Sequence, residues 1–302
     1  MSLGTMFPGF ERRRIRVNGG AYGAVTINLM IGGDGPPLLL LHGYPQTLAM
    51  WHRVAPQLAR DYTVVCPDLR GYGDSSKPRG LPDHANYSKR AMALDMAQVM
   101  ESLGYLGFHV VGHDRGGRVG HRMARDFAKR VRSLTVLDIS PTLKMYQSTS
   151  MQFAKAYWHW FFLIQESPLP ERMLEGQAPW YILRRLGRGP SGIKQFSRDA
   201  IIEYTRAFRD PRTIHATCED YRAAATIDLV HDKQDARRKI RMPVLALWGK
   251  HGVIEALFNC LADWREVAED VRGRALDCGH FIAEEKPREL LAELRRFLAP
   301  RT

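Results

Sequence analysis

Residues 110–118, VVGHDRGGR, decide how this chain folds and where its chemistry lies. An apolar run ends in a glycine-rich turn, and a helix-like segment follows. This order is typical of a strand–turn–helix elbow, which lifts its central residue above the edge of a sheet. Gly112, Gly116 and Gly117 fit such an elbow because any larger side chain would collide with the crowded backbone. The residue at the tip is Asp114.

A carboxylate at this tip predicts a particular reaction. An aspartate can displace a leaving group from saturated carbon and form an ester on the enzyme, which water must then cleave. Asp114 therefore indicates an alkyl halide or an epoxide as substrate. The alternative is an ordinary Gly-Asp turn, because short glycine motifs often match by chance.

Composition is typical of a globular protein of one large domain or two smaller ones. The chain has 302 residues, of which 45% are hydrophobic and 25% charged. No apolar run approaches the ~20 residues that span a bilayer, and the N-terminus lacks a signal pattern, so we expect a cytoplasmic protein without a membrane partner. The 4 cysteines lack metal-ligand spacing, which favours reduced thiols and predicts no metal site.

The net charge of +12 is distributed along the whole chain. Lysine and arginine form no basic motif, so we expect no nucleic-acid partner. A merely basic surface is the simplest interpretation, and attraction of a small anion toward a cleft is the alternative.

Short apolar runs alternate with amphipathic segments, which predicts an α/β protein with helices on both sides of a parallel sheet. The expected strands are residues 13–17, 25–30, 37–41, 63–66, 108–111, 134–139, 244–248 and 274–276, the first two as an antiparallel hairpin. Residues 141–240 interrupt the alternation with aromatic, helix-like segments broken at Pro168, Pro170, Pro179 and Pro190. We therefore expect a helical cap at 141–240, inserted between core segments 1–140 and 241–302.

Further motifs carry a family resemblance. LHGYP at 41–45, DLRGYGDS at 68–75 and GHF at 279–281 accompany the elbow, and together they resemble the α/β-hydrolase fold. HDRGGR at 113–118, YWHW at 157–160 and CEDYRA at 218–223 are similar to haloacetate dehalogenases of the fluoroacetate dehalogenase group. The resemblance implies an eight-stranded, mostly parallel sheet, conversion of haloacetates to glycolate and halide without a cofactor, and a homodimer.

Three residues are expected to perform the reaction. Asp114 would be the nucleophile, and His280, late in the chain, would activate water because a neutral imidazole accepts a proton near neutral pH. The histidine needs an acid to fix its tautomer. Asp138 ends one predicted strand and Glu255 follows another; the resemblance favours Asp138. Two backbone N–H groups, those of Arg115 and Tyr44, are expected to bind the oxyanion.

Arg115 and Arg118 predict an anionic substrate, a small haloacid. Both lie in the first helical turn after the elbow, where the helix dipole disfavours cations, so a negative group should compensate them. Two guanidinium groups can hold a substrate carboxylate while Asp114 stays ionised. The alternative is that one of them pairs with a structural carboxylate of the cap.

The resemblance also implies halide-binding residues. His159, Trp160 and Tyr221 match the family's positions and offer an imidazole N–H, an indole N–H and a phenol O–H. Such an aromatic run also fits a helix core. An epoxide hydrolase is the alternative function, with two cap tyrosines protonating the ring oxygen, but it leaves Arg115 and Arg118 without a role.

Overall fold

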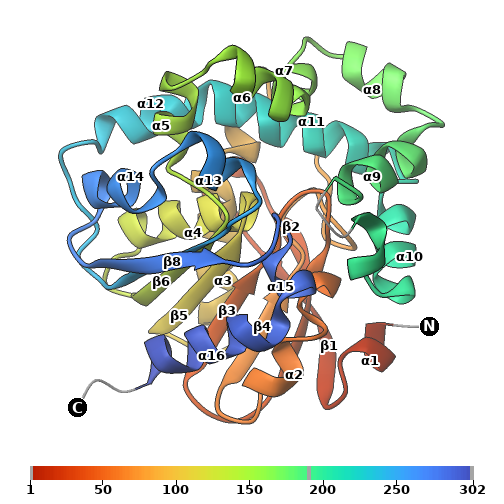
Figure 1. Cartoon of the computed structure of the whole chain (residues 1–302). Coiled ribbons are helices and arrows are strands. Elements are labelled where there is room, and N and C mark those ends of the chain that lie inside the picture. Colours follow the sequence, from red (N-terminus) through yellow and green to blue (C-terminus); the bar gives the residue numbers. More distant parts are fainter. Residues whose placement is uncertain (1–2, 189–191, 300–302) are drawn as a thin grey trace.

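The computed structural model describes residues 3–188 and 192–299, and within them eight strands form one sheet (Figure 1). The strands are β1 (Phe10–Val17), β2 (Val25–Gly32), β3 (Pro37–Leu41), β4 (Thr63–Pro67), β5 (Phe108–His113), β6 (Val131–Leu137), β7 (Val244–Gly249) and β8 (Val271–Leu276). Their order is β1-β2-β4-β3-β5-β6-β7-β8, in which β2 pairs antiparallel with both β1 and β4 and all other neighbours pair parallel. The predicted α/β-hydrolase sheet is confirmed.

Helices surround this sheet and form a layer along the top of Figure 1. The core helices are α1 (Leu3–Met6), α2 (Ala55–Leu58), α3 (Lys89–Ser102), α4 (Arg115–Asp126), α13 (Val253–Leu257), α14 (Cys260–Val267), α15 (Ile282–Glu285) and α16 (Pro287–Leu298). Between β6 and β7 lie α5 (Thr142–Gln147), α6 (Met151–Ala156), α7 (Trp158–Leu163), α8 (Leu169–Leu174), α9 (Ala178–Leu186), α10 (Arg198–Ala207), α11 (Pro211–Ala225) and α12 (Ile227–Gln234).

Burial explains the sheet order. Central strand β3 ends in four leucines that are fully buried, as expected for a parallel strand covered on both faces. Strand β1 lies at the sheet edge, and most of its side chains are exposed or half-buried. The sequence located every strand but placed the start of β1 three residues late and the end of β6 two residues late, since boundaries depend on ladder hydrogen bonds that the pattern does not encode.

The helices between β6 and β7, called the cap helices from here on, follow the proline breakers seen in the sequence. Pro168 immediately precedes α8, and Pro170 and Pro179 lie in the first turns of α8 and α9, where a missing N–H leaves no helical bond unmade. Pro190 lies outside the described residues. The division into segments 1–140, 141–240 and 241–302 stays a prediction.

The elbow joins β5 to α4 at Asp114. The φ angle of Asp114 is 44°, an unusual value for a residue with a side chain. Close packing around the turn requires glycine, because a Cβ at Gly116 would lie 2.4 Å from the carbonyl oxygen of His42 and one at Gly43 would lie 2.7 Å from Cβ of Asp114. The two loops therefore approach each other closely enough for the Tyr44 backbone to reach the elbow.

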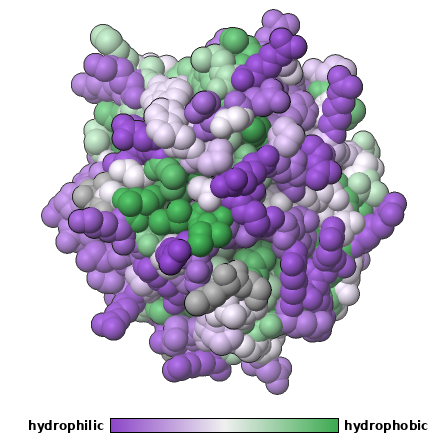
Figure 2. All heavy atoms as spheres, turned by 90° about the vertical axis from the view of Figure 1, so that its right-hand side faces the viewer, coloured by the Kyte–Doolittle hydropathy of each residue, from purple (hydrophilic) through white to green (hydrophobic). Residues whose placement is uncertain are grey.

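The face that carries α9 and α10 is mostly hydrophilic, with one apolar patch near its middle (Figure 2). Exposed apolar side chains on these two helices include Trp180, Leu183 and Ile202. Within residues 3–188 and 192–299, every helix is too short or too polar to cross a membrane.

Candidate active site

Asp114 lies at the carboxyl end of β5, held by its own backbone and by the loop after β3. Its backbone N–H donates to the carbonyl oxygen of Leu137 at 3.2 Å, and its side chain is almost fully buried. The backbone N–H of Tyr44 donates to Oδ2 of Asp114 at 3.0 Å. One carboxylate oxygen is therefore fixed by an amide, while Oδ1 accepts no hydrogen bond within the described part of the chain.

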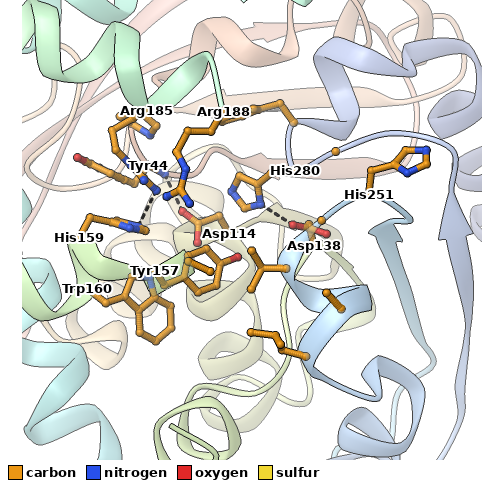
Figure 3. Close-up of a pocket in the computed structure, with 18 of the residues that line it drawn as sticks. Tyr44, Asp114, Asp138, Tyr157, His159, Trp160, Arg185, Arg188, His251 and His280 are labelled. Carbon is orange, nitrogen blue, oxygen red and sulfur yellow. Dashed lines mark hydrogen bonds and ion pairs between the residues drawn. The ribbon is translucent and has the colours of Figure 1, made fainter. Parts of the chain in front are cut away.

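His280 is bonded to Asp138. Nδ1 of His280 donates to Oδ2 of Asp138 at 2.5 Å, and Oδ1 of Asp138 accepts from the Gly249 backbone N–H at 2.9 Å (Figure 3). This arrangement fixes the imidazole tautomer and leaves Nε2 as the proton acceptor. Asp138 has a φ angle of 53°, so both acidic residues occupy strained turns at strand ends.

The loop that carries His280 is held from two sides. The carboxylate of Glu285 accepts the backbone N–H groups of Gly279 at 2.8 Å and Phe281 at 3.0 Å. Nε2 of His113 donates to the carbonyl oxygen of His280 at 2.9 Å. These contacts hold the backbone around His280 and make no hydrogen bond to the nitrogen atoms of its ring.

Glu255, the other acid considered from the sequence, is engaged elsewhere. It lies exposed on α13 and accepts a hydrogen bond from the indole N–H of Trp248. Asp138 is the carboxylate that bonds His280 in this structure.

Charges at the site favour the ionised form of Asp114. Burial alone would raise the pKa of Asp114, but His280, Arg118, His113 and Arg115 together lower it below its ordinary value. Burial alone would lower the pKa of His280, whereas its hydrogen bond to Asp138 and the charges of Asp138 and Asp114 raise it. Asp114 is therefore a carboxylate at neutral pH, and His280 accepts a proton readily.

Arg115 is fully buried and paired with an acid of the cap. Its Nε donates to Oδ2 of Asp220 at 2.9 Å, and its Nη2 donates to Oδ1 at 2.6 Å. Asp220, on α11, also accepts from Lys89 and from the hydroxyl of Tyr72. Nη1 of Arg115 is buried without a partner in the described part of the chain, so one edge of the guanidinium is left for a ligand.

Arg118 makes no ion pair with a carboxylate of the described residues. Its Nη1 donates to the carbonyl oxygen of Ser140 at 3.2 Å and to the hydroxyl of Thr142 at 2.9 Å, and its Nε is buried without a partner among residues 3–188 and 192–299. The guanidinium carbon lies 4.8 Å from the ring centre of Trp160. Arg118 therefore carries a positive charge that forms no ion pair among the described residues and that helps to lower the pKa of Asp114.

The three aromatic residues expected to bind halide lie together. The ring centres of His159 and Tyr221 are 5.8 Å apart, and those of Trp160 and Tyr221 are 6.3 Å apart. Arg115 lies 4.1 Å from the Tyr221 ring centre. Nδ1 of His159 and the hydroxyl of Tyr221 are buried and unpartnered among the described residues.

A cavity of about 590 Å³ opens beside these residues (Figure 3). Polar side chains of its wall include Tyr44, Asp114, Tyr157, His159, Arg185 and His280, and α13 contributes Val253, Ala256 and Leu257. Trp160 also lines it. Arg115, Arg118 and Tyr221 do not line this cavity in the described part of the chain. Arg118 and Tyr221 contact the lining residues Trp160 and His159, and Arg115 packs on Tyr221.

Two residues of this region were missed from the sequence. Asp220 lies within the motif at 218–223, but a spacing of over a hundred residues gave no sign that it pairs with Arg115. Arg185 reaches the cavity from α9, where it reads as an ordinary basic residue of a last helical turn. Only the packing of the cap brings either side chain to the site.

The described residues contain one group with metal-ligand spacing, formed by Glu171, His215 and Glu219. Arg222 donates to Glu171 at 2.7 Å and to Glu219 at 2.7 Å. A guanidinium thus already compensates these carboxylates, so the cluster is explained as an ion-pair network.

Comparisons with known proteins agree with this fold. The α/β hydrolase fold family matches residues 36–287. A fluoroacetate dehalogenase from Burkholderia sp. is 49% identical over 97% of this chain and 95% of its own length. A soluble epoxide hydrolase from Corynebacterium sp. strain C12 is 35% identical over 91% of this chain and 94% of its own.

A solved structure is similar over the whole fold. It belongs to a Nostoc sp. PCC 7120 protein assigned to the α/β hydrolases and matches with 52% identity and a TM-score of 0.92, covering 96% of this chain and 98% of that one. The eight-stranded sheet with its elbow and these full-length similarities lead to one assignment. The chain belongs to the α/β-hydrolase family, in the group that contains fluoroacetate dehalogenase.

Proposed function

We propose that this protein hydrolyses the carbon–halogen bond of haloacetates, fluoroacetate included, to glycolate and halide through an ester on Asp114. One observation carries the proposal: four buried donors have no partner in the described part of the chain, and two of them belong to arginines whose charges act on Asp114. They are Nη1 of Arg115, Nε of Arg118, Nδ1 of His159 and the hydroxyl of Tyr221. A site rich in unused donors fits a ligand made of acceptors, such as a carboxylate with a halogen.

Arg115 and Arg118 would offset the repulsion between Asp114 and a negatively charged substrate. A haloacetate brings a second negative charge close to Asp114, and at ~4 Å two like charges repel by about 4 kcal/mol near a protein surface. The free edge of Arg115 and the unpaired charge of Arg118 offset that repulsion. We assign substrate carboxylate binding to this pair.

Asp114 would attack with the oxygen that Tyr44 does not hold. Oδ1 forms a bond to the substrate's α carbon, and the halide leaves with the electron pair of the broken bond. Oδ2 becomes the carbonyl oxygen of the ester and keeps the Tyr44 N–H at 3.0 Å. The same N–H then stabilises the oxyanion when water attacks, with the Arg115 N–H as the second expected donor.

Halide departure would use the donors of the cap. The Tyr221 hydroxyl and Nδ1 of His159 are buried and unpartnered among the described residues, and Trp160 lines the cavity beside them. These donors act mainly as charge develops on the leaving group, so they lower the barrier more than they strengthen substrate binding.

His280 would complete the cycle. Its Nε2 takes a proton from water, and the resulting hydroxide attacks the ester carbonyl carbon. The bond between this carbon and Oδ1 then breaks, so Oδ1 leaves as the hydroxyl oxygen of glycolate and the water oxygen stays in the Asp114 carboxylate. Glycolate leaves with the proton returned by His280, whose positive charge Asp138 stabilises at 2.5 Å.

Halide release and oxygen labelling test this function. Incubation with fluoro-, chloro- and bromoacetate should release halide, and single turnover in heavy-oxygen water should place label in the Asp114 carboxylate. Asp114→Asn should abolish both signals. Label in glycolate alone, with none in the protein, would contradict the ester.

The epoxide alternative has its own observation: Tyr157 lines the cavity and the Tyr221 hydroxyl is unpartnered in the described part of the chain. An epoxide carries no carboxylate, so this alternative leaves Arg115 and Arg118 without a role. Diol from styrene oxide, with no halide from any haloacetate, would favour it over our proposal.

Cytoplasmic residence and a homodimer stay predictions. Light scattering of the purified chain would test the dimer.

A further inference from the structure

Arg185 is a cation at the cavity that the reaction above does not use. It lies half-buried on the last turn of α9, and its Nη2 donates to Nε2 of His159 at 3.1 Å (Figure 3). Its Nε and Nη1 atoms are buried, and no partner for either atom, nor any carboxylate at ion-pair distance, occurs among residues 3–188 and 192–299. Among the described residues, the Arg185 guanidinium is therefore held by its hydrogen bond to the His159 ring.

This contact fixes the histidine tautomer. A guanidinium carries only donors, so Nε2 of His159 must accept, and the ring proton of a neutral imidazole then sits on Nδ1. Burial, with further positive charge from Arg185, lowers the pKa of His159 well below its ordinary value, which keeps the ring neutral. Nδ1 is buried without a partner in the described structure, so its N–H is ready for a ligand.

His159 lies among the leaving-group donors. Its ring stacks on that of Tyr44 with centres 5.9 Å apart and meets Tyr221 at 5.8 Å. Tyr44 is the residue whose backbone N–H holds Asp114. Contacts therefore connect Arg185 to Asp114 through His159 and Tyr44.

We propose that Arg185 is a positioning residue for halide departure: it holds His159 as the Nδ1–H donor and places a positive charge behind that donor. This inference rests on the function proposed above. A cation bonded to the far nitrogen makes the Nδ1–H a stronger donor, because charge-assisted hydrogen bonds polarise the groups they connect. The benefit is largest for fluoride, whose charge is the most concentrated.

The helix dipole alone does not account for Arg185. Cations are favoured at helix C-termini, and α9 ends with Arg184 as well as Arg185. Arg184 is exposed, whereas Arg185 turns its guanidinium toward His159. Arg184 is consequently the matched control, with the same helix, the same charge and the same helical turn.

Kinetics with two leaving groups test the proposal. Arg185→Gln should lower kcat on fluoroacetate about tenfold more than on bromoacetate, the loss expected when one charge-assisted hydrogen bond in the transition state becomes neutral. Arg185→Lys should restore part of the difference, and Arg184→Gln should leave the fluoride-to-bromide ratio unchanged. Equal losses on both substrates for Arg185→Gln would overturn the assignment, even though haloacetate hydrolysis itself stood.

The tautomer gives a readout that does not depend on activity. Nuclear magnetic resonance of protein with isotope-labelled histidine separates Nδ1–H from Nε2–H rings, and His159→Asn identifies the His159 signals by their disappearance. We expect Nδ1–H in the native protein and in Arg184→Gln, and a shift toward Nε2–H in Arg185→Gln. An Nε2–H ring in the native protein would refute the inference whatever the enzyme hydrolyses.

Discussion

Replacement of Asp220 by asparagine tests how the cap acid holds Arg115. Asp220 is fully buried, and its two oxygens accept Arg115 at 2.9 Å and 2.6 Å and the Tyr72 hydroxyl at 2.7 Å, with Lys89 as a further donor. An amide group in either orientation turns an NH₂ toward Arg115. Removal of one partner from a buried ion pair costs about 3–5 kcal/mol, so we expect Asp220→Asn to lose stability of that size.

The expected loss has a defined pH range. Burial alone would raise the pKa of Asp220, but Arg115 and Lys89 reverse this and lower it far below its ordinary value. A depressed carboxyl pKa stabilises the fold above the unfolded-state value of about 3.9, and this contribution is lost as pH falls through the folded-state pKa. The difference between native protein and variant should therefore be complete at neutral pH.

Urea unfolding at neutral pH, followed by tryptophan fluorescence, measures the change. Asp74→Asn is the control because Asp74 pairs at the surface with Arg12 and Arg206. The side chains of these two arginines are 46% and 47% exposed. A surface pair contributes about 0–1 kcal/mol. Equal losses for Asp220→Asn and Asp74→Asn would refute the argument. Haloacetate KM should also rise in Asp220→Asn, since Arg115 loses the contacts that orient its free edge.

Three more substitutions examine the hydrolytic step. His280→Asn should form the Asp114 ester and stall, seen as a glycolyl adduct in the mass spectrum; substrate binding without an adduct would contradict this division of roles. Activity of the native protein should fall as pH drops through the His280 pKa, which lies above the ordinary value near 6.5. Asp138→Asn should shift this acidic fall in activity to lower pH and reduce kcat on the order of 10⁴-fold. An unshifted fall would exclude Asp138 as the acid that supports His280. Glu255→Gln should change kcat/KM by less than about twofold, as for an exposed side chain, whereas a large loss would return Glu255 to the site.

Local sequence rules were sufficient for the elements of the sheet. Apolar runs such as residues 37–41 located buried strands, and the glycines at 112, 116 and 117 predicted the elbow, because these signals depend on neighbouring residues. Strand ends were less accurate, as the start of β8 shows: it begins at Val271, and residues 274–276 were expected. Most side chains of β8 are exposed or half-buried, so its sequence lacks the apolar run by which the other strands were located.

The sequence by itself determined which residue stands at the tip of the elbow, the chain order of Asp114, Asp138 and His280, and the cationic helix start after Asp114. These are properties of short segments. Only the tertiary structure decided which partner each side chain finds: Asp138 bonds His280, Asp220 accepts Nε and Nη2 of Arg115, and Arg185 bonds His159. Such pairings join segments up to 142 residues apart and depend on how the sheet and the helices between β6 and β7 pack, so neither spacing nor residue type encodes them.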